Sequence, residues 1–82
     1  MDTKSIIEGI KKIAENYGLT ISDDEIEYAE FSDTWYITPY EGECGISCRG
    51  GLWYGENINS YTIRFIREDD WKMFDEIAQF LA

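Results

Sequence analysis

Two cysteines form the one pattern in this chain that suggests a metal or redox site. Cys44 and Cys48 are separated by three residues in "ECGISC", and the chain contains no histidine. On an extended strand the two side chains share a face about 13 Å apart, beyond the reach of a disulfide unless the chain turns sharply. A zinc site would need carboxylates in place of His, a poor match to structural tetrahedral sites. We therefore expect two reduced thiols, no metal and no cofactor.

Candidate catalytic groups are few. The sequence has no G-x-S-x-G motif, and the Gly-rich "RGGLWYGEN" lacks the GK[ST] of a phosphate-binding loop. Paired carboxylates act as acid and base only where a cleft separates their pKa values. A nucleophilic Cys44 or Cys48 would have no His to activate it. The sequence predicts a binding protein without catalytic residues, and not an enzyme.

The carboxylates are concentrated in one part of the chain. Of the 17 acids, nine lie within residues 13–48, which contain no Lys or Arg. The densest run is "SDDEIEYAEFSD", residues 22–33, where six of twelve residues are acidic. A field of this sign repels nucleic acids and anionic lipids, because phosphate binding requires Lys and Arg. We expect neither direct nucleic-acid binding nor membrane binding.

Such a run has a simpler interpretation as a solvated face, and acid excess is also typical of halophilic proteins. If residues 25–31 are extended, however, Glu25 and Glu27 project from the same side about 6.7 Å apart and repel by roughly 0.6 kcal/mol even in water. Dispersed charges would give solubility without this cost. A basic partner would convert the repulsion into affinity and fast association, which favours a binding surface.

Tyrosines lie within and beside this run, and Tyr provides a large contact area with few rotatable bonds. Carboxylates interleaved with tyrosines suit a surface rich in Arg and Lys, through ion pairs and cation–π contacts. Tyr54 is a further candidate of the same kind. The predicted binding residues are Asp23, Asp24, Glu25, Glu27, Tyr28, Glu30, Asp33, Tyr36, Tyr40, Glu41 and Glu43.

Two amphipathic helices must support this surface. Residues 5–17 carry an isoleucine stripe, with Ser5 and Glu8 as a capping box and Gly18 just past the end. Residues 69–81 repeat the pattern behind an acidic start. The stripe of the second helix is Trp71, Phe74, Ile77, Ala78 and Leu81, and the three tryptophans, Trp35, Trp53 and Trp71, are expected to be largely buried.

Residues 34–66 are rich in β-branched and aromatic residues, and four strands are predicted there: 34–40, 43–48, 52–55 and 60–66. Gly50-Gly51 indicates a two-residue hairpin connection. Residues 25–31 are expected to be a further strand, turning at Ser32-Asp33, although the capping-box spacing of Ser22 and Glu25 also allows a helix start. Pro39 then falls near a strand end or on an edge.

The resulting fold class is α+β, with the order α-β-β-β-β-β-α and an antiparallel meander of four to five strands in one domain, residues 1–82. Both helices are expected on one face of the sheet. The other face is then open to solvent or to a partner. Adjacent aromatics such as Trp35-Tyr36 place one ring on each side of the sheet.

In size and charge the chain is similar to small phage-encoded inhibitors: anti-CRISPR proteins, anti-restriction proteins and uracil-DNA glycosylase inhibitors. The likeness is one of composition and implies no site residues. We expect a DNA-mimic inhibitor that occupies the basic groove of a nucleic-acid-binding enzyme. The alternatives are an immunity protein that neutralises a basic nuclease toxin, and a self-associating interaction domain. The protein is expected in the cytoplasm, as a monomer or homodimer.

Overall fold

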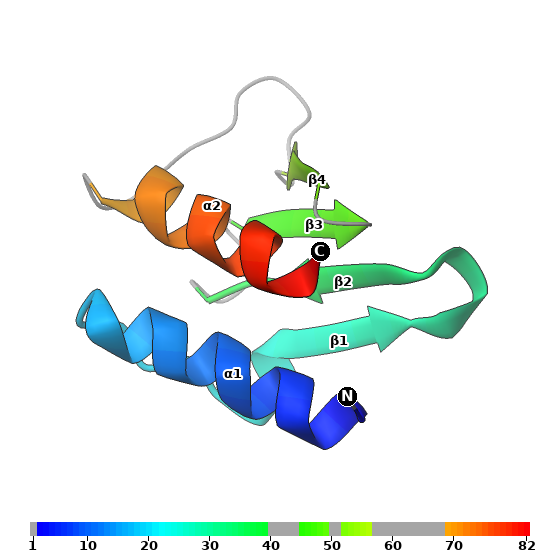
Figure 1. The fold of residues 1–82 in the computed structure, drawn as a ribbon, viewed down its shortest axis with the longest axis horizontal. Helices are drawn as coiled ribbons and strands as arrows, with labels where there is room; N and C mark the ends of the chain where they lie inside the picture. The colour runs from blue at the N-terminus through cyan, green and yellow to red at the C-terminus, as the bar shows by residue number, and fades with distance from the viewer. Residues whose placement is uncertain (1, 40–44, 50–51, 57–68) are drawn as a thin grey trace.

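The computed structural model describes residues 2–39, 45–49, 52–56 and 69–82. Within these ranges, four antiparallel strands form one sheet in the order β1-β2-β3-β4, with a helix near each end of the chain (Figure 1). The predicted α+β class is therefore confirmed, and the predicted strand at 60–66 lies outside the described residues. The elements are α1 (Thr3–Asn16), η1 (Asp23–Glu25), β1 (Ile26–Ala29), η2 (Glu30–Ser32), β2 (Thr34–Ile37), β3 (Gly45–Arg49), β4 (Leu52–Glu56) and α2 (Asp70–Leu81).

The strand register separates a core face from an open face. Ile26 of β1 stands opposite Ile37 of β2, and Trp35 of β2 stands opposite Cys48 of β3. All four side chains are buried. Since side chains alternate along a strand, the residues between them point to the opposite side of the sheet.

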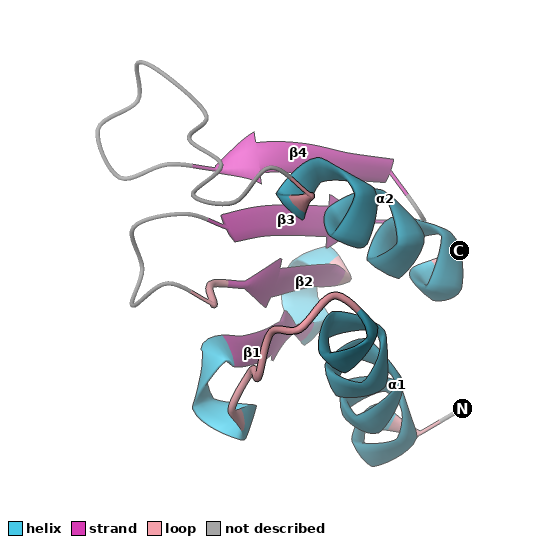
Figure 2. Cartoon of the chain, turned by 90° about the vertical axis from the view of Figure 1, so that its left-hand side faces the viewer, coloured by secondary structure: helices cyan, strands magenta, loops and turns pink. Residues whose placement is uncertain are grey.

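Both helices cover the core face (Figure 2). Helix α2 contacts β3 and β4, and the two helices contact each other. Together with the strands they enclose one hydrophobic cluster, to which Tyr28 and Phe80 add partly buried rings. The cluster consists of Ile10, Ala14, Ile21, Ile26, Trp35, Ile37, Cys48, Met73, Phe74, Ile77 and Ala78.

Helix α1 begins earlier than its sequence pattern predicts. The N-cap is Asp2, whose carboxylate accepts the backbone N–H of Ser5 at 2.8 Å, so the predicted capping box of Ser5 and Glu8 is wrong. The predicted helix end at Gly18 is confirmed, because Gly18 has a left-handed φ of 77°. Its N–H donates to Glu15, and that of Leu19 to Ala14, which is a Schellman motif.

The expected burial of Trp71 is wrong, because its side chain is 52% exposed. The buried stripe of α2 begins instead at Asp70 and continues through Met73, Phe74 and Ile77. Successive helical residues are rotated by about 100°, which places Trp71 roughly a quarter turn from the centre of that stripe. Trp35 is buried as expected, and the side chain of Trp53 lies outside the described part.

Strand boundaries depart slightly from those predicted. Strand β2 ends at Ile37, two residues before Pro39, which agrees with the expectation that Pro39 falls beside a strand end. Arg49 pairs with Leu52, so β3 and β4 are joined across two residues, as the Gly50-Gly51 pattern predicts. Among the described residues, no helix is long and apolar enough to cross a membrane.

The two helices approach each other closely at Gly9. A Cβ built on Gly9 would overlap the ring of Phe80, lying 2.7 Å from its Cε2 atom. This is closer than real Cβ atoms approach a neighbour, so a glycine is needed at this crossing unless the ring moves. The contact joins the middle of α1 to the end of α2.

We therefore expect Gly9→Ala to lower the free energy of unfolding by about 1 kcal/mol. An alanine normally stabilises a helix interior by about 1 kcal/mol relative to glycine, but overpacking costs about 1–3 kcal/mol. Urea unfolding of the variant measures the net effect. In a Phe80→Ala background the same substitution should become stabilising, because the ring is gone. A stabilising Gly9→Ala in the wild-type background would contradict this close packing.

Candidate functional site

The acidic run of residues 22–33 folds into one continuous arm at the edge of the sheet. It contains η1, the edge strand β1 and the turn η2, and we call it the acidic arm. The sequence allowed either a strand or a helix start in this segment, and each of the two alternatives is correct in part. The Ser22 capping box opens a short 3-10 turn in place of an α-helix, and the strand follows directly at Ile26.

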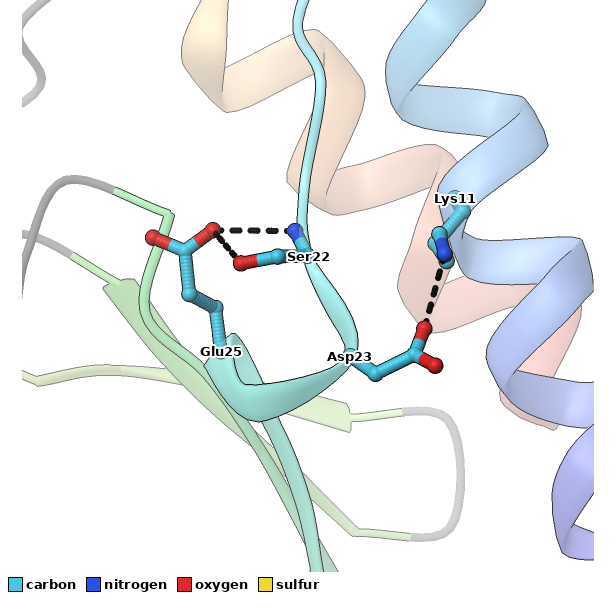
Figure 3. A network of polar contacts seen from close by, with 4 residues as sticks. All are labelled: Lys11, Ser22, Asp23 and Glu25. Carbon is cyan, nitrogen blue, oxygen red and sulfur yellow. Dashed lines mark hydrogen bonds and ion pairs between the residues drawn. The ribbon is translucent and has the colours of Figure 1, made fainter.

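Glu25 has a structural role at the start of the arm. Its Oε1 atom accepts the backbone N–H of Ser22 at 2.9 Å and the Ser22 hydroxyl at 2.8 Å (Figure 3). Glu25 therefore belongs to η1 and not to the strand, which makes the expected same-side repulsion of Glu25 and Glu27 along one strand wrong. The carboxylate stabilises the turn because it satisfies donors at the beginning of that turn.

Asp23 connects the acidic arm to helix α1. Its Oδ1 atom lies 2.7 Å from Nζ of Lys11 (Figure 3). The hydrogen bond to Asp23 raises the pKa of Lys11, and the charges of Asp23, Glu15 and Glu8 act in the same direction. Since the pair is solvent-exposed, it orients the arm more than it stabilises the fold.

Asp33 and Tyr28 hold the other end of the arm. The hydroxyl of Tyr28 donates to Oδ1 of Asp33 at 2.6 Å, and its ring packs on Trp35 with centroids 4.7 Å apart. Asp33 adopts a left-handed φ of 50°, which Asp tolerates better than most residues. The predicted Ser32-Asp33 turn is therefore longer than expected, because Ala29 pairs with Thr34 and four residues lie between them.

Three carboxylates of the arm remain available. Asp24, Glu27 and Glu30 are exposed, and none of their carboxylates forms a hydrogen bond or ion pair with the described part of the chain. They lie between Asp23 and Asp33, which, like Glu25, have internal partners. The predicted acidic site thus divides into carboxylates that build the arm and carboxylates that face solvent.

The open face of the sheet continues this surface. Glu27 stands opposite Tyr36, and Tyr36 stands opposite Ser47. Tyr36 is half-buried, and its hydroxyl forms no hydrogen bond with the described residues. Tyr54 is opposite Ser47 in the register, although its side chain lies outside the described part. Of the two predicted tyrosines whose side chains the structure describes, Tyr36 lies beside an available carboxylate, whereas Tyr28 donates to Asp33 at the β1–β2 turn.

Phe31 is a surface residue that the sequence analysis missed. It lies in η2 at the tip of the arm, and its side chain is 105% exposed. The sequence pattern could have revealed it. Ile26 and Tyr28 are two residues apart, as expected for side chains on the buried face of a strand, whereas Phe31 falls out of this two-residue period. An apolar residue out of phase inside an acidic turn is a candidate for exposure.

Other predicted residues cannot be placed. Tyr40, Glu41, Glu43 and Cys44 lie outside the described residues. Cys48 is buried in the core, and its reduced state stays a prediction. Within the described ranges, no group of three or more Cys, Asp or Glu residues is arranged to hold a metal ion.

Comparison of the chain with protein-family models, with curated proteins and with solved structures found no match.

We expect the pKa of Tyr28 to lie above its ordinary value of 10.0, because its hydroxyl donates to the Asp33 carboxylate and its ring is partly desolvated. Asp33→Asn retains an acceptor and tolerates the left-handed backbone, but removes the charge, so it should lower the pKa of Tyr28 towards 10. Titration of tyrosinate absorbance measures this, with Tyr28 assigned by comparison with Tyr28→Phe.

Stability should follow the same titration. The folded state holds the phenolic proton more tightly than the unfolded chain, so the contribution is complete below the unfolded pKa and is lost as pH rises through the folded pKa. The difference in urea midpoint between the wild type and Tyr28→Phe should therefore be smaller at about pH 11 than at about pH 9. A constant difference across this range would contradict the Tyr28–Asp33 hydrogen bond.

Proposed function

We propose that this chain is a small acidic binding protein that inhibits a nucleic-acid-binding enzyme by occupying its basic groove. The observation that supports this most directly is the presence of three solvent-facing carboxylates, Asp24, Glu27 and Glu30, on an arm that other acids hold in shape. Ionised carboxylates, like phosphates, are anionic acceptors that Arg binds in a bidentate manner. The arm can therefore compete for the side chains that bind a phosphate backbone.

The internal contacts of the arm favour binding over simple solubility. A solvated face needs no fixed shape, whereas here Lys11, Ser22 and Tyr28 each bind one carboxylate of the arm. Preorganisation reduces the entropy lost on association, so fixed charges give tighter binding than mobile ones. The net charge of −10 adds long-range steering towards a basic partner.

Self-association is less well supported. The open sheet face has Glu27 beside Tyr36, so a symmetric pairing of two such faces would bring like charges together. An immunity protein for a basic nuclease toxin uses the same electrostatics as the proposed inhibitor and differs in its target. In either case the partner is a basic protein, and we place the interaction in the cytoplasm.

The proposal is tested by immobilising the chain and exposing it to lysate at low and high salt. A retained protein is purified and its binding to labelled DNA or RNA is measured as the acidic chain is added. Stoichiometric loss of nucleic-acid binding, weaker at high salt, is expected. If the partner still bound nucleic acid in the presence of a saturating concentration of the acidic chain, the inhibitor function would be refuted. If the retained protein were a nuclease toxin, the chain would be identified as an immunity protein.

Neutralising the available carboxylates should slow association. We expect Asp24→Asn, Glu27→Gln and Glu30→Gln together to reduce the association rate by about tenfold or more at low salt and to flatten its salt dependence, because exposed charges act mainly by steering. Stopped-flow or surface-binding kinetics with the purified partner measure both quantities. Glu25 is left intact because it holds the η1 turn.

The matched control is a second triple variant, with Glu8→Gln, Glu15→Gln and Asp75→Asn. It changes the net charge by the same amount as the first, at exposed positions of the two helices. This control should retain most of the wild-type rate, because it changes the net charge but leaves the arm intact. Equal slowing by both triple variants would show that only net charge matters. No change in either would show that the acidic arm is a solvated face.

A further inference from the structure

We infer that Phe31 is the apolar anchor of the proposed complex, inserting into a socket of the basic partner that is rimmed by Lys or Arg. The inference rests on the proposed function and names the chemistry of its partner surface. Single exposed apolar residues are common on proteins, so exposure alone does not support a role. Three further features distinguish Phe31: its position, the rigidity of its turn and the charge around it.

Phe31 lies in η2, in the turn between β1 and β2. The turn between β1 and β2 projects beyond the ends of both helices (Figure 1). At 105% exposure the ring contributes no contact area to the core, unlike Tyr28 and Trp35 a few residues away. A projecting ring of this kind can enter a concave surface without a clash between the two proteins.

The turn that carries Phe31 is ordered without using its side chain. The backbone N–H of Asp33 donates to the Glu30 carbonyl at 3.3 Å, and the Thr34 hydroxyl donates to the Ser32 carbonyl at 3.0 Å. Tyr28 binds the Asp33 carboxylate from the strand. A polar residue at position 31 would satisfy this turn equally well, so folding gives no reason for an exposed phenylalanine. The backbone that carries the ring is therefore fixed before any partner binds. Only the two side-chain torsions of Phe31 are left to be ordered, which limits the entropy lost on binding.

The charge beside Phe31 defines the partner. Glu30 is exposed and available, and Asp33 lies two residues along the same turn. An apolar socket with a Lys or Arg rim complements this arrangement, because the rim pairs with carboxylates while the guanidinium of Arg also stacks on an aromatic face. A second copy of the chain would oppose acid to acid, and an anionic membrane would be repelled. A basic protein surface is the occupant that fits.

The test uses the nucleic-acid-binding protein purified on the immobilised chain. Phe31→Ala should accelerate dissociation by about tenfold or more and leave the association rate nearly unchanged, since an anchor acts after encounter. Phe31→Leu should restore part of the residence time, because it restores apolar area. Trp71→Ala is the matched control: it removes the other large apolar side chain that is exposed in the described part, on helix α2, and should dissociate like the wild type.

The possible outcomes are distinct. Unchanged dissociation of Phe31→Ala would overturn the anchor but keep the inhibitor function, provided that the partner still loses nucleic-acid binding. If the chain failed to displace nucleic acid from any retained protein, both the Phe31 anchor and the inhibitor function would be overturned. A wild-type dimer that Phe31→Ala converts to monomer in sedimentation would assign the ring to a second copy instead. A lowered urea midpoint for Phe31→Ala would mean that the ring packs within the fold, which also overturns the proposal.

Discussion

Burial on one side of the sheet is the constraint on which the rest of this structure depends. A chain of 82 residues has enough apolar material for one core, and both helices contribute to it. Ile26, Trp35 and Ile37 therefore face the helices, and their neighbours in the strands face outwards. No described helix covers the open face or the outer side of the edge strand, so we expect their side chains to determine how the molecule meets other molecules.

The acidic arm combines two uses of the same chemical group. Carboxylates that find donors within the chain stabilise turns and connect elements, as Glu25 does at Ser22 and Asp33 does at Tyr28. Carboxylates without such donors in the described part of the chain face solvent. Because the first set fixes the backbone, the second set is presented in a defined arrangement, which a uniformly mobile acidic segment could not provide.

Much of the fold could be predicted from local patterns. The two helices follow from apolar residues at helical spacing, and the end of α1 follows from Gly18. Predictions from local patterns were wrong where two residues suited the same structural position about equally well. Asp2 and Ser5 are both good N-cap residues, so residue type alone does not tell where the helix begins. In the structure the helix begins at Thr3, and the Asp2 carboxylate accepts the backbone N–H of Ser5. Trp71 belongs to the apolar pattern but lies at the border of the buried stripe.

The sequence by itself determined the charge, its concentration before residue 48, and the periodicities that define helices and strands. These properties depend on residue type and spacing along the chain, which any reading of the sequence includes. Only the tertiary structure decided which carboxylates have partners and which apolar ring is exposed. Lys11 reaches Asp23 because α1 packs beside the arm, and Phe31 is exposed because a four-residue turn projects past both helices. Both facts arise from contacts between segments, whose free energies are set by packing and not by local propensity.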